Sequence, residues 1–329
     1  MNTINVLILA GGDGSEHDVS IVSSQYLEKV LNSNKKFNIK KVIIHNNQWL
    51  YNNETPCFIN NNKTLIIGNE SFKIDYVIPC IHGYPGETGD IQSFLEINHI
   101  PYFGCDSWGS KACFNKITTK LYMDKANIPN SSYMFLCDND ESSINQAKEF
   151  FLTHKEVFVK AASEGSSVGC YKVSDINNLA DTINKAFSYC DYVLIEKSMK
   201  PRELEVAVYE YQGKLIATNP GEIITPNNNF YTYEEKYNKD SHSSTLIEAQ
   251  ISDEIKSKIK EFALKAFKLF KLRDLSRVDF FLTKDNEIIL NEINTFPGMT
   301  PISMFPKMLE HHGENMSDFL EDRILNSIK

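Results

Sequence analysis

Short apolar runs alternate with amphipathic segments along the first third of the chain. The runs NVLILA, KKVIIHN, YVIPCIHG and IPYFG are rich in the β-branched, aliphatic and aromatic residues that favour strands. Helical periodicity lies between them, from about Asp18 to Leu31 and in DIQSFLEIN. Alternation of this kind predicts an α/β fold built on an open parallel sheet, and this first domain should end near Gly104.

The pattern changes beyond that point. A helix rich in Lys and Met comes first, followed by VFVKAASEGSSVGCYKV, which predicts two strands joined by a glycine- and serine-rich loop. A helix around Leu179 to Ser188 and the strand YVLIEK complete this part. The last third contains the strands RELEVAVYEY and KLIATNP, a helix beginning at Ser252 and a C-terminal hairpin. We therefore expect three domains, at residues 1–104, 105–197 and 198–329.

A polar segment, residues 221–245, interrupts the last third. Loops of this length are uncommon in compact domains and usually act as lids or are disordered. Its centre, YTYEEKY, carries Tyr and Lys side chains that a mere linker would not need. We expect a lid over a site, with a permanently disordered surface loop as the alternative.

The C-terminal hairpin sets two carboxylates against each other. In RVDFFLTKDNEIILNEINT, a two-residue loop at DN would place Asp279 opposite Glu292 and Arg277 opposite Asn294. Two unit charges about 5 Å apart repel by roughly 3 kcal/mol at an effective dielectric constant near 20, so a positive group should lie between them. The three oxygen donors on this face, Asp279, Glu292 and Asn294, suit Mg²⁺ or Mn²⁺. The alternatives are a protonated carboxylate, or another register with both side chains in water.

A phosphate site would complement such a metal site. Lys160 ends an apolar strand, and Gly165, Ser166, Ser167 and Gly169 follow in a short turn. Successive backbone N–H groups in a turn of this type form an anion nest, to which a lysine adds a point charge. The alternative is an ordinary hairpin turn.

Two other segments carry polar side chains where a ligand could bind. Glu196 and Lys197 end a strand just before Glu203, so this hinge could bind an adenine edge and ribose hydroxyls, or Glu203 could be a surface carboxylate in a salt bridge. His82 and Glu87 occupy a glycine-rich strand-end loop, which faces either a ligand crevice or solvent. The segment GGDGSEHDVS lacks the third glycine of a dinucleotide-binding turn, so a nicotinamide cofactor is not expected.

Composition excludes several classes of protein. The net charge is −9 and no block of five or more Lys or Arg occurs, so a nucleic-acid partner is not expected. The seven cysteines show no Cys-x-x-Cys spacing, which argues against a disulfide framework or a structural zinc site. The N-terminal segment has no basic region or cleavage pattern, and no apolar run approaches 18 residues. We expect a cytoplasmic protein without a membrane span.

The order of the motifs is more specific than any one of them. GGDGSEHDVS, HGYPGETGDIQ, NKITTK, VFVKAASEGSSVG, NNFYTYEEKY, RVDFF and NEINTFPGMT together resemble the D-alanine–D-alanine ligase family over nearly the whole chain. The resemblance implies an ATP-grasp fold, with the ATP site between the central and C-terminal domains. It implies ATP-dependent joining of two D-alanines through an acyl phosphate, for peptidoglycan synthesis. It also implies two Mg²⁺ or Mn²⁺ ions, and it allows a homodimer.

The resemblance also implies roles for individual residues. The metal ligands would be Asp279, Glu292 and Asn294, and the ATP-binding residues would be Lys116, Lys160, Ser167, Glu196, Lys197, Met199 and Glu203. Residues acting on the reacting groups would be Glu16, Ser166, Tyr237, Arg277 and Gly298, with His82, Lys236 and Ser303 binding substrate.

Three positions depart from the family pattern. Asn115 stands where the family has Asp, Ala161 where it has Pro, and Thr88 where it has Asp. Two other functions fit the same motifs: an ATP-grasp ligase that joins other amino acids, and a nucleotide-binding relative without catalysis. The retained Arg277 argues against the second, because a protein that only binds nucleotides needs no oxyanion donor.

Overall fold

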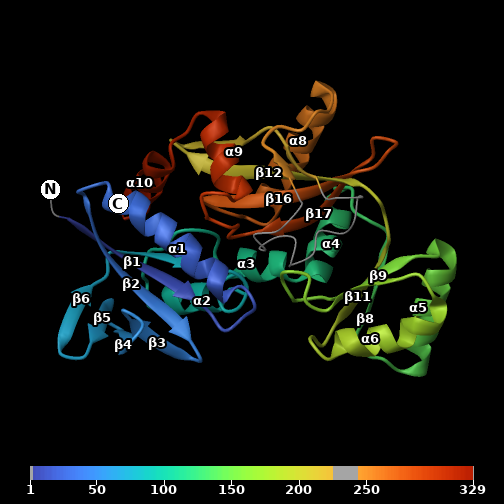
Figure 1. The fold of residues 1–329 in the computed structure, drawn as a ribbon, viewed down its shortest axis with the longest axis horizontal. Coiled ribbons are helices and arrows are strands. Elements are labelled where there is room, and N and C mark those ends of the chain that lie inside the picture. Colours follow the sequence, from blue (N-terminus) through green and yellow to red (C-terminus); the bar gives the residue numbers. More distant parts are fainter. Residues whose placement is uncertain (1–2, 225–243, 329) are drawn as a thin grey trace.

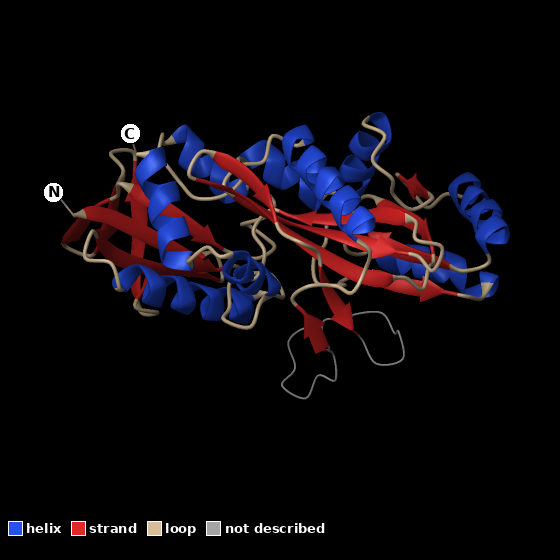
Figure 2. Ribbon diagram, turned by 90° about the horizontal axis from the view of Figure 1, so that it is seen from above, coloured by secondary structure: helices blue, strands red, loops and turns tan. Residues whose placement is uncertain are grey.

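The computed structural model describes residues 3–224 and 244–328, which form three sheets with helices packed around them (Figure 1). Lys236, Tyr237 and most of the predicted lid lie outside the described residues. The two chain ends lie close together at one end of the molecule (Figure 2). Among the described residues, no helix combines the length and apolar character that a membrane span requires.

The first sheet has seven strands in the order β6-β5-β4-β3-β2-β1-β7. Its parallel part is β1 (Ile4–Gly11), β2 (Phe37–His45) and β7 (Tyr76–Cys80), as the alternation of apolar runs predicted. The helices α1 (His17–Asn32) and α2 (Asp90–Ile97) also match the predicted segments. The predicted fourth strand was wrong, because IPYFG contributes only one bridge, between Val77 and Tyr102.

An antiparallel extension of this sheet was not predicted. It consists of β3 (Gln48–Tyr51), β4 (Thr55–Asn60), β5 (Thr64–Ile67) and β6 (Glu70–Lys73). Asn46 and Asn47 form the two-residue loop between β2 and β3, with φ of 49° and 57°. Asn tolerates positive φ better than most residues, and a two-residue loop with both φ values positive suits the twist of a hairpin.

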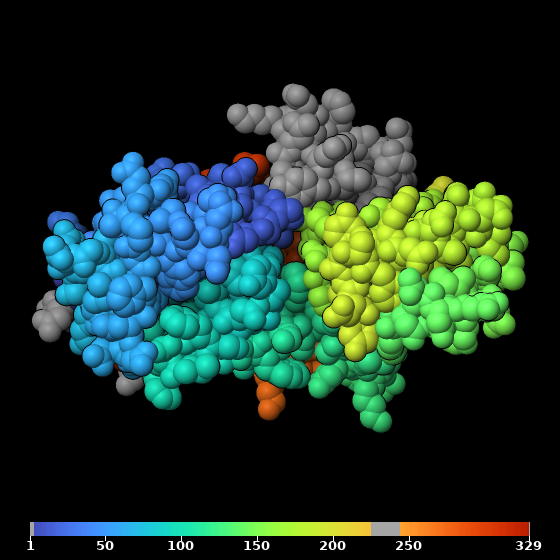
Figure 3. Space-filling model, turned by 90° about the horizontal axis from the view of Figure 1, so that it is seen from below, coloured from blue at the N-terminus to red at the C-terminus, as the bar shows by residue number. Residues whose placement is uncertain are grey.

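The central sheet has the order β10-β9-β11-β8. Its strands are β8 (Tyr133–Leu136), β9 (Val157–Ala161), β10 (Cys170–Val173) and β11 (Val193–Lys197), and its helical segments are α5 (Glu141–His154), η1 (Ile176–Asn178) and α6 (Leu179–Phe187). The antiparallel pair β9–β10 flanks the glycine- and serine-rich loop, as predicted. In the space-filling view the central domain forms a lobe beside the first domain (Figure 3).

The third sheet runs β15-β14-β12-β16-β17, with β13 also paired to β12. Its strands are β12 (Arg202–Tyr211), β13 (Lys214–Ala217), β14 (Gly221–Ile224), β15 (Ser244–Leu246), β16 (Leu275–Leu282) and β17 (Ile288–Asn294). The later helices are α8 (Asp253–Leu269), α9 (Met304–His312) and α10 (Met316–Ser327). The side chain of Ser252 caps α8 by accepting a hydrogen bond from the N–H of Ile255, so the predicted start of this helix is confirmed.

Two apolar cores hold the outer domains and the linking helices together. Tyr76 and Phe103 from the first domain pack with Leu275, Phe305 and Phe319 from the last, and all five are fully or almost fully buried. The helices α3 (Ser107–Phe114) and α4 (Lys116–Lys125) contribute to a second core with the third sheet. Residues just after 104 therefore pack on the third sheet, and α4 lies between this sheet and the central one.

The C-terminal hairpin has the facing pairs that the sequence predicted. Asp279 lies opposite Glu292, and Arg277 lies opposite Asn294. The alternative register, with both carboxylates facing away from each other, is wrong.

The turn that produces these pairs differs from the predicted one. The Thr283 N–H donates to the Glu287 carbonyl oxygen at 3.0 Å, which leaves three residues in the loop rather than two. The last of them, Asn286, has φ of 61°, as expected for a three-residue hairpin loop. A bulge next to Asp279 adds one residue, Asn291, to β17 and restores the predicted pairing.

Candidate active site

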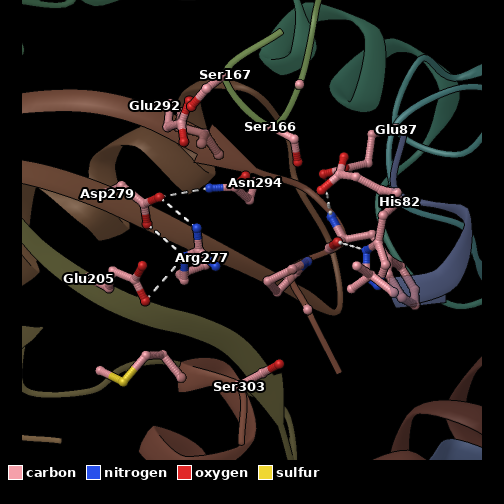
Figure 4. A pocket seen from close by; sticks show the side chains of 18 of the residues that line it. His82, Glu87, Ser166, Ser167, Glu205, Arg277, Asp279, Glu292, Asn294 and Ser303 are labelled. Atoms are coloured by element: carbon pink, nitrogen blue, oxygen red, sulfur yellow. Dashed lines mark hydrogen bonds and ion pairs between the residues drawn. The ribbon is translucent and has the colours of Figure 1, made fainter. Parts of the chain in front are cut away.

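One cavity of about 1190 Å³ lies where the three sheets meet, and it collects most of the predicted site residues (Figure 4). Its lining includes Glu16, His82, Lys116, Lys160, Ser166, Ser167, Glu203, Arg277, Asp279, Glu292, Asn294, Gly298 and Ser303. Of the described residues predicted to bind ATP, three lie outside this lining: Glu196, Lys197 and Met199. The last two line a separate, smaller cavity.

Arg277 pairs with one of the two facing carboxylates, Asp279, and with Glu205 on β12. Its Nε and Nη2 atoms each donate to one oxygen of Asp279 at 2.8 Å, and Nε lies 3.4 Å from Glu205 Oε2 (Figure 4). Burial disfavours the charge on Arg277, but Asp279 and Glu205 outweigh burial and hold its pKa above the ordinary range. The guanidinium is therefore permanently charged and fixed by a bidentate contact.

The donor set on this strand face suits a hard divalent cation. Asp279 and Glu292 supply carboxylate oxygens, and Asn294 donates its amide N–H to Asp279 at 2.9 Å. Within residues 3–224 and 244–328, no three His, Cys, Asp or Glu side chains are grouped as a metal site. The candidate ligands are two carboxylates, Asp279 and Glu292, and the side-chain amide of Asn294. Oxygen ligands of this kind match the preference of Mg²⁺ or Mn²⁺.

Two lysines also line the cavity. Lys116 begins α4 and donates to the carbonyl oxygen of Glu164, while Lys160 near the end of β9 forms an ion pair of 2.6 Å with Glu196. Burial lowers the pKa of Lys116, although Glu292 opposes that effect. Burial would also lower the pKa of Lys160, but Glu196 reverses the effect and raises it. Lys160 therefore keeps its charge despite burial.

The glycine- and serine-rich loop is held in an unusual backbone conformation. Ser166 and Ser167 have φ of 49° and 62°, in a region of backbone conformation that residues other than glycine rarely adopt. Strain of this kind is concentrated at ligand-binding loops. Glu16 from the first domain approaches this loop closely, since a Cβ atom on Gly165 would lie 3.1 Å from Glu16 Oε2, and one on Gly83 would lie 3.3 Å from it. These glycines leave room for the Glu16 carboxylate beside the loop.

His82 and Glu87 hold the segment that follows β17. His82 Nδ1 donates to the Phe296 carbonyl oxygen at 3.1 Å, so its Nε2 accepts from Ser23 Oγ at 2.9 Å. Glu87 accepts from the Gly83 N–H at 3.0 Å and from the Phe296 N–H at 3.4 Å. These contacts fix the approach to Gly298 across the boundary between the first and last domains.

Burial perturbs both of these side chains. It lowers the pKa of His82, although Glu16 acts in the opposite direction, so the imidazole is neutral. Burial, together with repulsion from Glu16, raises the pKa of Glu87 to about 8. Glu87 therefore keeps its proton near neutral pH, and a strongly perturbed carboxyl group of this kind is typical of functional sites.

Ser303 and Gly298 form the end of the cavity near α9. Ser303 Oγ accepts from the Thr300 N–H at 3.1 Å and lies 2.7 Å from Thr300 Oγ1. A Cβ atom at Gly298 would lie 2.9 Å from Ser303 Oγ, so only glycine leaves the serine in place. Gly298 and Ser303 therefore lie close together at this end of the cavity.

Two of the departures from the family pattern have clear structural roles. Asn115 keeps a helix cap, because its side-chain oxygen accepts from the Thr118 N–H at 2.8 Å. Ala161 donates its N–H to the Gly169 carbonyl oxygen at 2.9 Å, a hydrogen bond that proline could not make.

Sequence reasoning missed several residues of the site. Glu205 also lines the cavity, and its position two residues after Glu203 on one strand face was a usable signal. Lys120 follows Lys116 by four residues on α4, the spacing that places two side chains on one helix face. No sequence pattern marks Ser23, because its role is to donate a hydrogen bond to His82, which is distant in the sequence.

The chain matches known proteins along its length. Residues 5–105 match the family model described as D-ala D-ala ligase N-terminus, and residues 122–325 match D-ala D-ala ligase C-terminus. Similar relatives include the D-alanine–D-alanine ligases of Tolumonas auensis, 54% identical, and Vibrio atlanticus, 55% identical, each over 330 residues and 100% of both chains.

Solved structures give the same result. D-alanyl-alanine synthetase A from Vibrio cholerae superposes with a TM-score of 0.95 at 48% identity, covering 100% of this chain and 99% of that one. The VanG D-Ala:D-Ser ligase from Enterococcus faecalis has a TM-score of 0.88 at 28% identity, covering 100% of both. The chain therefore belongs to the D-alanine–D-alanine ligase family and has its ATP-grasp fold.

Proposed function

We propose that this protein joins two molecules of D-alanine to D-alanyl-D-alanine, converting ATP to ADP and phosphate, as a step in peptidoglycan synthesis. The observation that carries the proposal is one cavity whose lining combines the cations Lys116, Lys160 and Arg277 with the carboxylates of Asp279 and Glu292. Cations and cation ligands that line one cavity suit the phosphates of a nucleotide and the metal ions that accompany them. The reaction uses small molecules and is assigned to the cytoplasm, with a homodimer as the proposed assembly.

The nucleotide would bind between the central and last domains. Lys116, Lys160, Ser167 and Glu203 line the cavity. In this proposal the two lysines and the N–H groups around Ser167 contact the phosphates, and Glu203 accepts hydrogen bonds from the ribose hydroxyls. In this proposal Lys197 and Met199 contribute the hinge between β11 and β12 beside the adenine. Glu196 contributes through the ion pair that holds Lys160.

Asp279, Glu292 and Asn294 would hold two Mg²⁺ or Mn²⁺ ions. When bound, such ions neutralise phosphate charge during phosphoryl transfer. Arg277 contacts Asp279 directly, so the same carboxylate links the metal ligands to the proposed oxyanion donor.

The reaction has two balanced steps. The carboxylate of the first D-alanine attacks the γ-phosphorus of ATP, which forms an acyl phosphate and releases ADP. The amine of the second D-alanine then attacks the acyl carbon, and phosphate leaves as the peptide bond forms. Arg277 and the N–H of Gly298 would stabilise the oxyanion, and Glu16 would bind the first ammonium group. Ser303 would bind the second substrate, while His82 fixes the segment leading to Gly298.

Ser166 follows Gly165, the loop residue that Glu16 approaches, and lines the same cavity. In this proposal its hydroxyl hydrogen-bonds with the groups that orient the first substrate. A neutral His82 fits this arrangement, because it donates one N–H to a carbonyl oxygen and accepts at its other nitrogen. The site then distinguishes mirror images by leaving polar groups unpaired with the wrong enantiomer.

Phosphate release tests the proposal directly. The purified protein is assayed with ATP, MgCl₂ and either D-alanine, L-alanine or D-serine, and the dipeptide is identified by mass spectrometry. D-Alanine should give phosphate and dipeptide in equal amounts, and L-alanine should give neither. D-Serine is included because the VanG structure is a D-Ala:D-Ser ligase. Equal turnover with both alanine enantiomers, or ATP hydrolysis without dipeptide, would refute the proposal.

A further inference from the structure

A lysine that does not line the main cavity lies directly behind its phosphate-facing wall. Lys120 is only 2% exposed, although lysine is seldom buried without a partner. It lies one helical turn after Lys116 on α4, so the two side chains share a face of the helix. Lys116 lines the cavity, whereas Lys120 is packed between α4 and the central sheet.

Lys120 completes a buried ion triad. Its Nζ lies 2.6 Å from Oε1 of Glu196, and Lys160 Nζ lies 2.6 Å from Oε2 of the same carboxylate. Ser131 Oγ accepts from Lys120 at 2.8 Å and donates to Glu196 Oε1. The Lys120 ammonium also lies 5.2 Å from the centre of the Tyr133 ring. Each oxygen of Glu196 therefore has its own cation.

The sheet register explains why this carboxylate faces Lys160. Glu196 on β11 lies opposite Phe158 on β9 and Tyr133 on β8, and Lys160 is two residues beyond Phe158 on the same face. The lysine thus reaches back along the sheet to the carboxylate. Lys160 also lines the cavity, which makes it the member of the triad that can contact a ligand.

The net charge of the triad indicates what Lys120 contributes. A Glu196–Lys160 pair alone would be neutral, so the carboxylate would offset much of the attraction between Lys160 and an anion. With Lys120 the triad carries one surplus positive charge, and water screens it only weakly because Lys120 and Glu196 are buried and the Lys160 side chain is 11% exposed. An anion in the cavity meets this positive charge at Lys160, because Lys120 does not line the cavity.

We propose that Lys120 is a positioning residue for Lys160: by sharing Glu196 it fixes the Lys160 ammonium at the cavity wall and leaves its charge available to a nucleotide phosphate. This inference rests on the proposed nucleotide site. It assigns to the Glu196 carboxylate a role in holding two lysines.

A double-mutant cycle tests this role. The dissociation constant of ADP is measured by calorimetry for the wild-type protein, Lys120→Met, Lys160→Met and the double variant. Lys120→Met should weaken ADP binding roughly tenfold in the wild-type background, within the range measured for coupled neighbours. In the Lys160→Met background the same change should alter binding less than about twofold, because the residue it acts through is gone. Lys120→Arg, which keeps the charge, should restore most of the affinity.

Controls separate this role from a general effect on folding. Lys125→Met removes an exposed lysine from the same helix and should leave ADP binding unchanged. If Lys120→Met does not fold, Ser131→Ala offers a milder change, because it removes the hydroxyl that contacts both Lys120 and Glu196. Its loss of ADP affinity should likewise disappear in the Lys160→Met background.

The outcomes are distinguishable. No ADP binding by the wild-type protein would refute the proposed nucleotide site itself. ADP binding by the wild-type that is unaffected by Lys120→Met or Ser131→Ala would refute the inference alone. An equal loss of affinity in both backgrounds would show that Lys120 supports the fold and does not act through Lys160.

Discussion

Replacing Glu87 with Gln should remove a large pH dependence from the stability of this protein. Glu87 is 9% exposed and lies beside Glu16, and burial followed by repulsion from Glu16 raises its pKa from 4.5 to about 8. The folded protein thus keeps this proton up to about pH 8, whereas the unfolded chain loses it near pH 4.5. Folding is accompanied by proton uptake at this group between those two values.

The sign and size of the effect follow from linkage. The unfolded state binds fewer protons than the folded state in this window, so stability falls as pH rises. The contribution of Glu87 is fully present below pH 4.5 and is lost as pH approaches 8. The interval from 4.5 to about 8 corresponds to roughly 5 kcal/mol, at about 1.4 kcal/mol per pH unit.

Urea denaturation between pH 5 and pH 9 measures this term as the difference in unfolding free energy between the wild-type protein and Glu87→Gln. The other titrating groups cancel in that difference. The wild-type should lose several kcal/mol relative to the variant as pH rises across this range. Glu70→Gln, at an exposed position in β6, is the matched control and should show no such trend. Glu16→Gln should reduce the slope, because it removes the neighbouring charge.

A difference between the wild-type protein and Glu87→Gln that stays constant within about 0.5 kcal/mol from pH 5 to pH 9 would refute the reasoning. Infrared spectroscopy gives an independent check. In the difference spectrum between the wild-type protein and Glu87→Gln, a protonated carboxyl stretch should be present at pH 6 and should disappear near pH 8.

Three other changes probe the site and its supports. Glu292→Gln should lower turnover about a hundredfold or more with little change in melting temperature, because it removes a charge from the proposed metal ligands; normal kcat would contradict that role. Gly86→Ala should destabilise the fold, since its Cβ would lie 2.0 Å from the Ile81 carbonyl oxygen, and an unchanged melting temperature would contradict the close contact. Ser23→Ala should lower the unfolding free energy measured by urea denaturation by about 1–3 kcal/mol, because the buried Met299 N–H loses its acceptor. A smaller decrease would contradict a role for this hydrogen bond in stability.

Local pattern was enough to predict the elements that carry the site. The apolar runs gave the parallel strands β1, β2 and β7, and Ser252 marked the start of α8. Alternation along β16 and β17 placed Asp279 opposite Glu292, even though the predicted turn was one residue too short. The pairing held because the bulge at Asn291 compensates for the longer turn. Strand β13, whose residues are partly exposed, was still predicted from its apolar run.

The antiparallel strands β3 to β6 could not be predicted in the same way. They are three short hairpins with many polar and exposed residues, so they carry little periodic signal. Their stability comes from the sheet they extend and from asparagine turns such as Asn46–Asn47. The high asparagine content of the sequence did not by itself predict where these turns lie.

The sequence by itself determined which residues could do chemistry, since carboxylates, lysines and glycine-rich turns are read directly from residue type and spacing. Only the tertiary structure decided how their charges are balanced. Arg277 lies between Asp279 and Glu205 because β12 pairs with β16, and Glu196 is held by two lysines because α4 packs against the central sheet. His82 contacts Phe296 across 214 residues of sequence. Charge compensation acts through space in a buried region of low dielectric constant, so it depends on which distant elements meet and not on their order along the chain.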